Sequence, residues 1–296
     1  MSEESTAGPA RPSGADRALV VGGGTMGFGI GWVCAVAGFD VTLVEPDPVR
    51  RRALVDSVQE RAAKQVARDP EGPSTHELTA RLDVSDRIPV TVPDGGWRVA
   101  VEAVPERLDL KRTVLAALAE QRPRLLGTNT SSIAISDLAA DLDDPAALVG
   151  LHFFNPVWAM PLLEIVRQPS TPDAVLAEAY DIAARLGKEV ITVADQPGFA
   201  TSRLGVAIGL EAMRMLQDGV ASAADIDRAM ELGYRHPMGP LRLSDLVGLD
   251  VRLDIARTLQ RAHGDRFAPP QILIDLVAAG DLGRKTGRGF HDWSTS

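Results

Sequence analysis

The stretch ALVVGGGTMGFGIGWVCAVAGFDVTLVEPD, residues 18–47, decides the fold of this chain. It begins with a short apolar run over 18–21 and continues after the glycines with a second β-like run over 40–44. Between the runs, Gly22, Gly24 and Gly27 form G-x-G-x-x-G at the opening of a helix that runs to about Ala37. Strand, glycine turn, helix and strand in this order are typical of one half of a nucleotide-binding α/β sheet.

Each glycine of this motif has a physical task. The first permits a tight turn, the second lets the backbone approach a pyrophosphate, and the third lets helix and strand pack closely. Phosphates then lie at the N-terminus of the helix. Glu45 follows Gly27 by 18 residues, where an acid can hydrogen-bond an adenosine ribose. We therefore predict a dinucleotide site that includes the three glycines, Thr25, Met26 and Glu45.

Strand and helix patterns alternate up to about residue 197, and only helical patterns follow. The sequence thus predicts a Rossmann-type doubly wound sheet over 17–197 and a smaller all-helical domain over 198–296. Residues 1–16, rich in Ser, Ala, Gly and Pro, predict a disordered tail. Further strands are predicted over Arg98–Val104, Arg124–Asn129 and Glu189–Ala194, and helices over Val49–Arg68, Asp109–Glu120, Thr171–Leu186 with Thr171 as N-cap, Phe199–Gln217, Leu241–His263, Gln271–Ala279, and one that starts at Ser222.

The stretch ALVGLHFFNPVWAMPLLEIV, residues 147–166, places one histidine and one glutamate in two apolar runs. The prolines of NPVWAMP fit a turn between the runs. His152 and Glu164 lie equally far from Trp158, so a reversal there makes them cross-strand neighbours with Cβ atoms about 5 Å apart. A carboxylate beside an imidazole fixes its tautomer. Two interpretations stand at this point: a general base with its orienting group, or a core histidine tied to a glutamate for structure.

Charge and cysteine usage narrow the classes of function. The formal net charge of −9 argues against a nucleic-acid surface, which needs a basic stripe. The single cysteine, Cys34, excludes an intrachain disulfide and lies in an apolar segment that favours a buried role, so we expect a cytoplasmic protein. Residues 18–39 carry no charge, but seven glycines interrupt them, which disfavours a membrane span.

Two polar clusters have both a structural and a functional interpretation. Arg61, Lys64 and Arg68 share a side of the predicted helix over 49–68, where they could bind phosphates or form a solvated face. The sequence TNTSS, residues 128–132, follows a predicted strand. Polar groups in that position either meet a ligand at the carboxyl end of the sheet or cap a turn.

The chain resembles the 3-hydroxyacyl-CoA dehydrogenase family, of the 3-hydroxybutyryl-CoA dehydrogenase type, from about residue 18 to 293. The motifs that carry the resemblance are GGGTMGFGI, VEAVPE, TNTSS, GLHFFNPVWAMPLLEI, DQPGFATSR, GVASAADID, HPMGPLRLSDLVGLD and LGRKTGRGF. The resemblance implies NAD-dependent, reversible oxidation of a 3-hydroxyacyl thioester without a metal, in a homodimer of fatty acid metabolism. It implies that His152 is the base and Glu164 its partner. It further implies a substrate contact by Ser131, a role for Asn155 in holding the reacting oxygen or the cofactor, and cofactor contacts by Gly22, Gly24, Gly27, Glu45, Glu106, Lys111, Asn155 and Lys285.

The chain departs from the family pattern at three positions. Ser202 stands where the family usually has asparagine, Thr128 where it has serine, and His291 where it has an aromatic residue. We expect Ser202 to leave room in the site and to need help from another polar group. No clear match exists to the basic cluster that grips the nucleotide of CoA in some relatives, so the carrier is either CoA or an acyl carrier protein. Two alternatives stay open: a dehydrogenase of a free hydroxy acid, such as a sugar acid, and a nucleotide-binding relative without catalysis.

The acid at the end of the second strand also bears on the choice of cofactor. Glu45 would repel a 2′-phosphate, so the sequence predicts a preference for NAD over NADP. Arg50, Arg51 and Arg52 begin more than a turn into the next helix, and we expect them to point away from the site.

Overall fold

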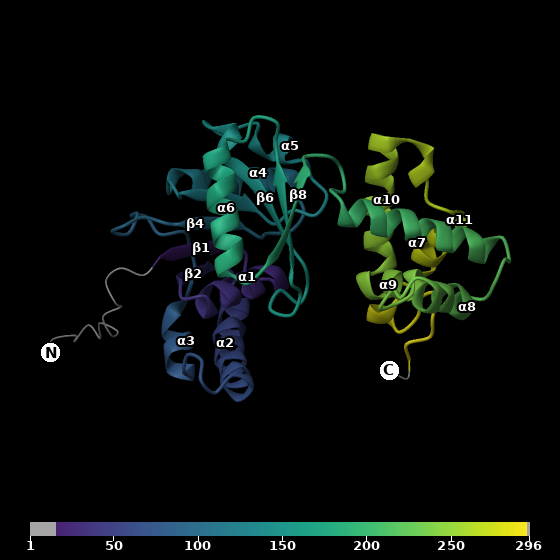
Figure 1. Ribbon diagram of the computed structural model, residues 1–296, viewed down its shortest axis with the longest axis horizontal. Helices are drawn as coiled ribbons and strands as arrows, with labels where there is room; N and C mark the ends of the chain where they lie inside the picture. Colours follow the sequence, from purple (N-terminus) through teal and green to yellow (C-terminus); the bar gives the residue numbers. More distant parts are fainter. Residues whose placement is uncertain (1–15, 295–296) are drawn as a thin grey trace. The chain divides into compact units, whose positions relative to one another are not determined.

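The computed structural model describes residues 16–294, which form two compact units (Figure 1). The first comprises the residues up to Thr130 together with Ile135–Asp195. The second comprises Ser131–Ala134 and the residues from Gln196 onward. The limits 17–197 and 198–296 stay our proposal for the two domains.

The first unit is built on one eight-stranded sheet with the order β3-β2-β1-β4-β5-β6-β7-β8. Neighbouring strands are parallel except for β6 and β7, which pair antiparallel. Strand order reverses between β1 and β4, as in a doubly wound sheet. The strands are β1 (Arg17–Val21), β2 (Asp40–Val44), β3 (Leu82–Ser85), β4 (Val99–Glu102), β5 (Leu125–Thr128), β6 (Leu148–Phe153), β7 (Leu162–Arg167) and β8 (Glu189–Ala194).

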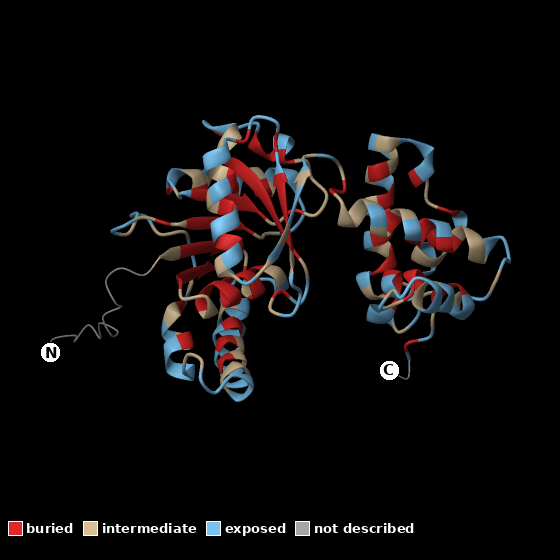
Figure 2. Cartoon of the chain, viewed as in Figure 1, coloured by how far each residue is buried: buried red, intermediate tan, exposed pale blue. Residues whose placement is uncertain are grey.

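Helices cover both faces of this sheet. In Figure 1, α1 and α6 lie over one face and α4 and α5 over the other. The residues of β1, β2 and β4 to β7 are almost all buried, whereas the edge strand β3 is partly exposed, and the helices expose their outer sides (Figure 2). The predicted Rossmann-type architecture is therefore confirmed. The helices of this unit are α1 (Thr25–Val36), α2 (Pro48–Arg68), α3 (Thr75–Arg81), α4 (Leu108–Glu120), α5 (Ile135–Ala139), η1 (Pro145–Ala147) and α6 (Asp173–Arg185).

The second unit is helical, as predicted. Its core is apolar and includes Leu210 and Met213 of α7, Leu241 of α9 and Leu253 of α10. No helix within residues 16–294 is long and apolar enough to cross a membrane. The elements are α7 (Thr201–Gln217), α8 (Ala223–Arg228), η2 (Ala229–Gly233), α9 (Pro240–Val247), α10 (Leu249–His263), η3 (Asp265–Phe267), α11 (Gln271–Ala279) and η4 (Arg284–Thr286).

Three local predictions were wrong. The single helix expected over Leu241–His263 is two helices, because Gly248 has φ +102°, which ends α9 and starts α10. Thr171 does not cap α6; its hydroxyl accepts from the backbone N–H of Gln168, and Pro172 is the N-cap. Asp16, the one described residue of the predicted tail, forms ion pairs with Arg98 and Arg185. The rest of that prediction lies outside the described residues.

Between the breaker-rich segments 69–72 and 93–96, the sequence indicates a helical piece and edge structure without bounds, and α3 and β3 lie there. Their signal is present in Ser74 and Glu77, three residues apart. The Ser74 hydroxyl accepts from the Glu77 N–H, and the Glu77 carboxylate accepts from the Ser74 N–H, which is a complete capping box. The prediction for Ser222 is confirmed, because its side chain accepts from the N–H of Asp225 at the start of α8.

Candidate active site

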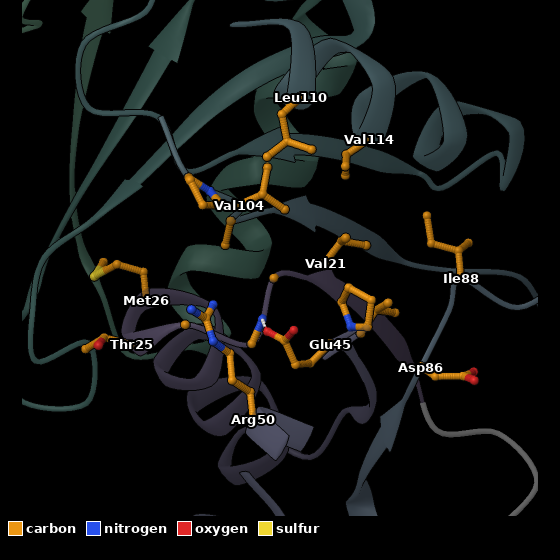
Figure 3. Close-up of a pocket in the computed structure, with 17 residues that line it drawn as sticks. Val21, Thr25, Met26, Glu45, Arg50, Asp86, Ile88, Val104, Leu110 and Val114 are labelled. Atoms are coloured by element: carbon orange, nitrogen blue, oxygen red, sulfur yellow. Dashed lines mark hydrogen bonds between the residues drawn. The ribbon is translucent and has the colours of Figure 1, made fainter. Parts of the chain in front are cut away.

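A pocket of about 590 Å³ lies at the carboxyl ends of β1, β2 and β4. The glycine loop and the first residues of α1, Thr25 and Met26, form one wall (Figure 3). Leu110 and Val114 of α4 and Ile88 after β3 supply apolar side chains on other sides. Its position at the strand ends, beside a helix N-terminus, is where open α/β sheets bind nucleotides.

The backbone of the glycine loop fits a pyrophosphate. Gly22 has φ +112°, and a Cβ there would lie 2.5 Å from the Ala103 carbonyl oxygen. A Cβ on Gly27 would lie 1.7 Å from the Gly22 oxygen, so helix and loop are in direct backbone contact. A Cβ on Gly24 meets nothing within 4 Å, and no side chain caps the N–H groups of α1. The exposed amides at the start of α1 are therefore available to an anion.

Glu45 is held in a single orientation beside this loop. Its side chain is 6% exposed. Oε2 accepts from the Gly23 N–H at 3.2 Å, drawn dashed in Figure 3, and Oε1 accepts from the Asp47 N–H at 3.0 Å. These bonds aim a fixed negative charge at the pocket, which suits the hydroxyl groups of a ribose.

The prediction for the three arginines after Glu45 was wrong for Arg50. Its side chain lines the pocket and turns toward the glycine loop (Figure 3), because the first turn of α2 faces the end of β2. Arg51 instead donates to the Glu45 carbonyl oxygen at 2.9 Å, and Arg52 donates to that of Pro48 at 3.2 Å. Arg50 is thus the one cation among the residues that line this pocket.

A buried cluster at the end of β4 involves the predicted residues Glu106 and Lys111. Lys111 is 1% exposed, and its Nζ lies 2.9 and 3.0 Å from the two Glu102 oxygens and 3.2 Å from Glu106 Oε2. These contacts match the three donors of an ammonium group, so in this structure Lys111 positions carboxylates. The Thr128 hydroxyl donates to Glu102 and that of Thr130 to Glu106, both at 2.6 Å. Thr128 thus keeps the hydroxyl of the serine usual at that position.

His152 and Glu164 face each other across β6 and β7, which confirms the pairing predicted from their spacing. His152 Nδ1 lies 2.6 Å from Glu164 Oε2, and the histidine is 6% and the glutamate 0% exposed. The histidine ring also stacks at a tilt on Phe154, with 4.5 Å between centroids. Two strands and an aromatic ring hold this pair, and its catalytic role stays a proposal.

The other predicted site residues lie in separate places. Asn155 is exposed in the turn after β6, and Ser131 follows β5 with intermediate burial. Ser202 is the second residue of α7. Lys285 of η4 binds both Asp250 oxygens at 2.6 Å. Their contacts to substrate or cofactor stay predictions.

Two of the three basic residues on α2 have structural partners. The Arg61 guanidinium lies 4.1 Å from the centre of the Trp158 ring, and Lys64 pairs with Glu60. His291, the third departure, lies 2.7 Å from Asp227 Oδ2 and joins the C-terminal segment to α8. Cys34 is buried as expected, and burial raises the pKa of its thiol to about 12.

Several pocket and site residues were missed from the sequence. Glu102 had a readable signal, because an acid inside the apolar run RVAVEAV needs a buried partner. The residues Asp86, Ile88, Leu110 and Val114 had none, since only packing brings their segments to the glycine loop.

A glycine-loop pocket on a doubly wound sheet, with a buried histidine and carboxylate on neighbouring strands, defines a dinucleotide-dependent oxidoreductase. The model of the 3-hydroxyacyl-CoA dehydrogenase NAD binding domain matches residues 17–196, and that of the C-terminal domain matches 198–293. The chain belongs to the 3-hydroxyacyl-CoA dehydrogenase family and is an NAD-dependent enzyme.

Individual relatives can be aligned with nearly the whole of this chain. The 3-hydroxybutyryl-CoA dehydrogenase of Mycobacterium tuberculosis is 38% identical over 291 residues, which cover 94% of this chain and 98% of the relative. The 3-hydroxyadipyl-CoA dehydrogenase of Escherichia coli is 36% identical over 280 residues, 93% of this chain and 58% of the relative. The crystal structure of (S)-3-hydroxybutyryl-CoA dehydrogenase PaaH1 from Ralstonia eutropha has a TM-score of 0.86 and 34% identity, and covers 95% of this chain and 100% of that one.

Proposed function

We propose that this enzyme oxidises a 3-hydroxyacyl thioester, such as 3-hydroxybutyryl-CoA, reversibly to the 3-oxoacyl thioester, with His152 as general base. The observation that carries the proposal is the buried 2.6 Å contact between His152 and Glu164. The family membership and the names of the relatives support the substrate class.

In this proposal, one nitrogen of the histidine accepts the proton of the substrate hydroxyl. Glu164 binds Nδ1, so acceptance of the hydroxyl proton falls to Nε2. The carboxylate fixes the tautomer and stabilises the imidazolium that forms. The nicotinamide, when bound, would accept the hydride from the substrate carbon that carries the hydroxyl.

The chain's other groups hold the reactants. The glycine loop and the uncapped amides of α1 would bind the pyrophosphate, and Glu45 the adenosine ribose. Ser131 and Asn155 are our candidates for contacts to the reacting oxygen or the cofactor. The Glu102–Lys111–Glu106 cluster would keep the loop after β4 in place.

The test is a panel of acetoacetyl-CoA, an acetoacetyl carrier protein and free 3-oxo acids, followed by the loss of reduced-nicotinamide absorbance. We expect reduction of a thioester and little reduction of the free acids. His152→Gln should remove this activity, whereas His236→Gln, a change at another histidine outside the pair, should not. Turnover of free acids alone would replace the proposal with the hydroxy-acid alternative, and no turnover at all would leave only nucleotide binding.

The enzyme would act as a homodimer through its helical unit. A groove of about 370 Å³ between α7, α8, η2 and α9 is lined mainly by apolar side chains such as Ile208 and Met215. On the same elements, Leu204 of α7 is 62% and Leu232 of η2 is 71% exposed. Light scattering should give a molar mass of two chains for the unaltered protein. For Ile208→Glu it should give the mass of a single chain. Val90→Glu, at a residue that is 90% exposed in the other unit, is the control.

A further inference from the structure

Arg252 of α10 is a buried cation for which residues 16–294 supply no counter-ion. It is 7% exposed, and its Nε has no hydrogen-bond partner. None of the ion pairs within residues 16–294 includes it, in contrast to Lys111 with its two carboxylates. Burial lowers the pKa of its guanidinium to about 10, so the group is still charged at neutral pH. An unpaired buried charge is strongly destabilising, which points to a role beyond folding.

Three acids of the second unit, one close to Arg252 in sequence and two that are buried, already have partners of their own. Asp250, two residues earlier, binds Lys285 through both oxygens. Asp245 accepts from the N–H groups of Phe290 and His291 and from Trp293 Nε1. Asp227 accepts from the backbone of α9 and lies against His291. The second unit therefore leaves the anion that Arg252 needs to a ligand.

The guanidinium lies against α7 close to a proposed substrate residue. A Cβ on Gly205 would lie 3.5 Å from Arg252 Nη1, so the absence of a side chain at Gly205 makes room for the charged group. Gly205 is three residues after Ser202, which places the two on one side of α7, about 4.5 Å apart along its axis. Ser202 is itself shorter than the asparagine usual in the family. A short side chain at 202, none at 205 and a cation at 252 thus occur on neighbouring parts of α7 and α10.

We propose that Arg252 binds a carboxylate at the far end of the substrate's acyl chain, so that the preferred substrates are 3-hydroxyacyl thioesters of dicarboxylic acids. The inference rests on the proposed function, through the position of Ser202. A guanidinium recognises a carboxylate with two parallel hydrogen bonds, and in a buried setting such bonds are strong and selective. An acyl chain without the carboxylate would leave the cation unpaired.

The test compares two six-carbon substrates that differ only in the terminal group, 3-oxoadipyl-CoA and 3-oxohexanoyl-CoA. The unaltered enzyme should have the higher kcat/KM for the adipyl compound by at least about tenfold. Arg252→Met should lower kcat/KM for the adipyl compound by about a hundredfold and change that for the hexanoyl compound less than threefold. Arg252→Lys should keep part of the preference, and Arg257→Met, at an exposed position on the same helix, should keep all of it. Equal losses on both substrates, or no preference in the unaltered enzyme, would overturn the proposal.

A binding measurement separates this proposal from the proposed function. Adipyl-CoA and hexanoyl-CoA lack the 3-hydroxyl and cannot react. The adipyl compound should raise the melting temperature more than the hexanoyl compound, and Arg252→Met should remove the difference. Without ligand, Arg252→Met should melt at or above the temperature of the unaltered protein, since it relieves an unpaired charge. If Arg252→Met instead lowers the melting temperature without ligand and leaves the difference between adipyl-CoA and hexanoyl-CoA unchanged, Arg252 has a structural role. That result would overturn this proposal even if the enzyme turns over both substrates, as the proposed function expects.

Discussion

At the scale of single residues, two buried side chains, His152 and Lys111, are each paired with a carboxylate on a neighbouring element. Glu164 of β7 holds His152 of β6, and Glu102 of β4 holds Lys111 of α4. Both carboxylates are fully buried, which strengthens their bonds and makes an unpaired partner costly. Loss of one member should therefore disturb the other.

The histidine pair gives the first prediction. His152→Gln and Glu164→Gln should each lower kcat by about two orders of magnitude or more, and the double variant should be little worse than the histidine change. The reason is that the glutamate acts only through the imidazole. Steady-state kinetics and NAD titration measure the effect, and the Kd for NAD should barely move. Losses that multiply would mean that the two groups act independently.

The pocket charges give the second prediction. NAD should have a kcat/KM at least about tenfold above that of NADP, because the fixed carboxylate of Glu45 repels a 2′-phosphate. Glu45→Gln should narrow the difference, since Arg50 then faces the phosphate without competition. Arg50→Gln in that background should widen it again, whereas Arg52→Gln, whose side chain bonds Pro48, should not. Equal efficiency with both cofactors in the unaltered enzyme would refute this account of Glu45.

At the scale of elements, the approach of α1 to β1 makes the cofactor loop. Gly27 makes the close backbone contact, whereas the space around the Cα of Gly24 is open within the protein. Because Gly24 has φ −68°, its backbone conformation is one that alanine also adopts. The two glycines thus differ in what an added side chain would meet within the protein. Substitutions at these positions can be told apart by experiment.

The third prediction uses this separation. Gly24→Ala should leave the melting temperature within about 1 °C and raise the KM for NAD by tenfold or more, because the methyl group enters space that the cofactor's phosphates need. Gly27→Ala should lower stability by about 1–3 kcal/mol, because its Cβ would lie 1.7 Å from the Gly22 oxygen. Calorimetry and initial rates on both variants are the measurements. The assignment fails if both variants lose stability equally.

At the scale of the whole molecule, an ion-pair network ties the start of β1 to β4 and α6. Arg98 lies 2.8 Å from Glu178 and also pairs with Asp16 and Asp181, and Arg185 pairs with Asp16 as well. Burial acts to raise the pKa of Asp16, but the hydrogen bonds from the two arginines prevail and hold it below its usual value. The hydrogen bonds of Arg98 with Glu178 and with Asp16 raise the pKa of its guanidinium. The network joins segments more than 80 residues apart in sequence.

The fourth prediction concerns acid stability. Since the pKa of Asp16 is lowered in the folded state, its contribution is present above the ordinary value of 3.8 and is lost as the pH falls below it. Arg98→Met should therefore lower stability at pH 7 by about 1–3 kcal/mol, and by less near pH 3. Arg87→Met, at a side chain that is 77% exposed, should have little effect at either pH. Denaturant unfolding at the two pH values decides, and an equal loss at both would exclude this role for Asp16.

The sequence by itself determined the sheet-and-helix architecture and the His152–Glu164 pairing. Both depend on short-range patterns: glycines at fixed offsets between apolar runs, and two polar residues spaced equally about a turn. Such patterns are set by backbone geometry, which acts between near neighbours in the chain. The α3 capping box was equally local and could have been found.

Only the tertiary structure decided which charges meet. Arg50 turns into the pocket, Lys111 bridges Glu102 and Glu106, and Arg252 lies unpaired beside Gly205. In each case the decisive neighbour comes from a different element, so its distance is set by how helices and strands pack and not by spacing along the chain.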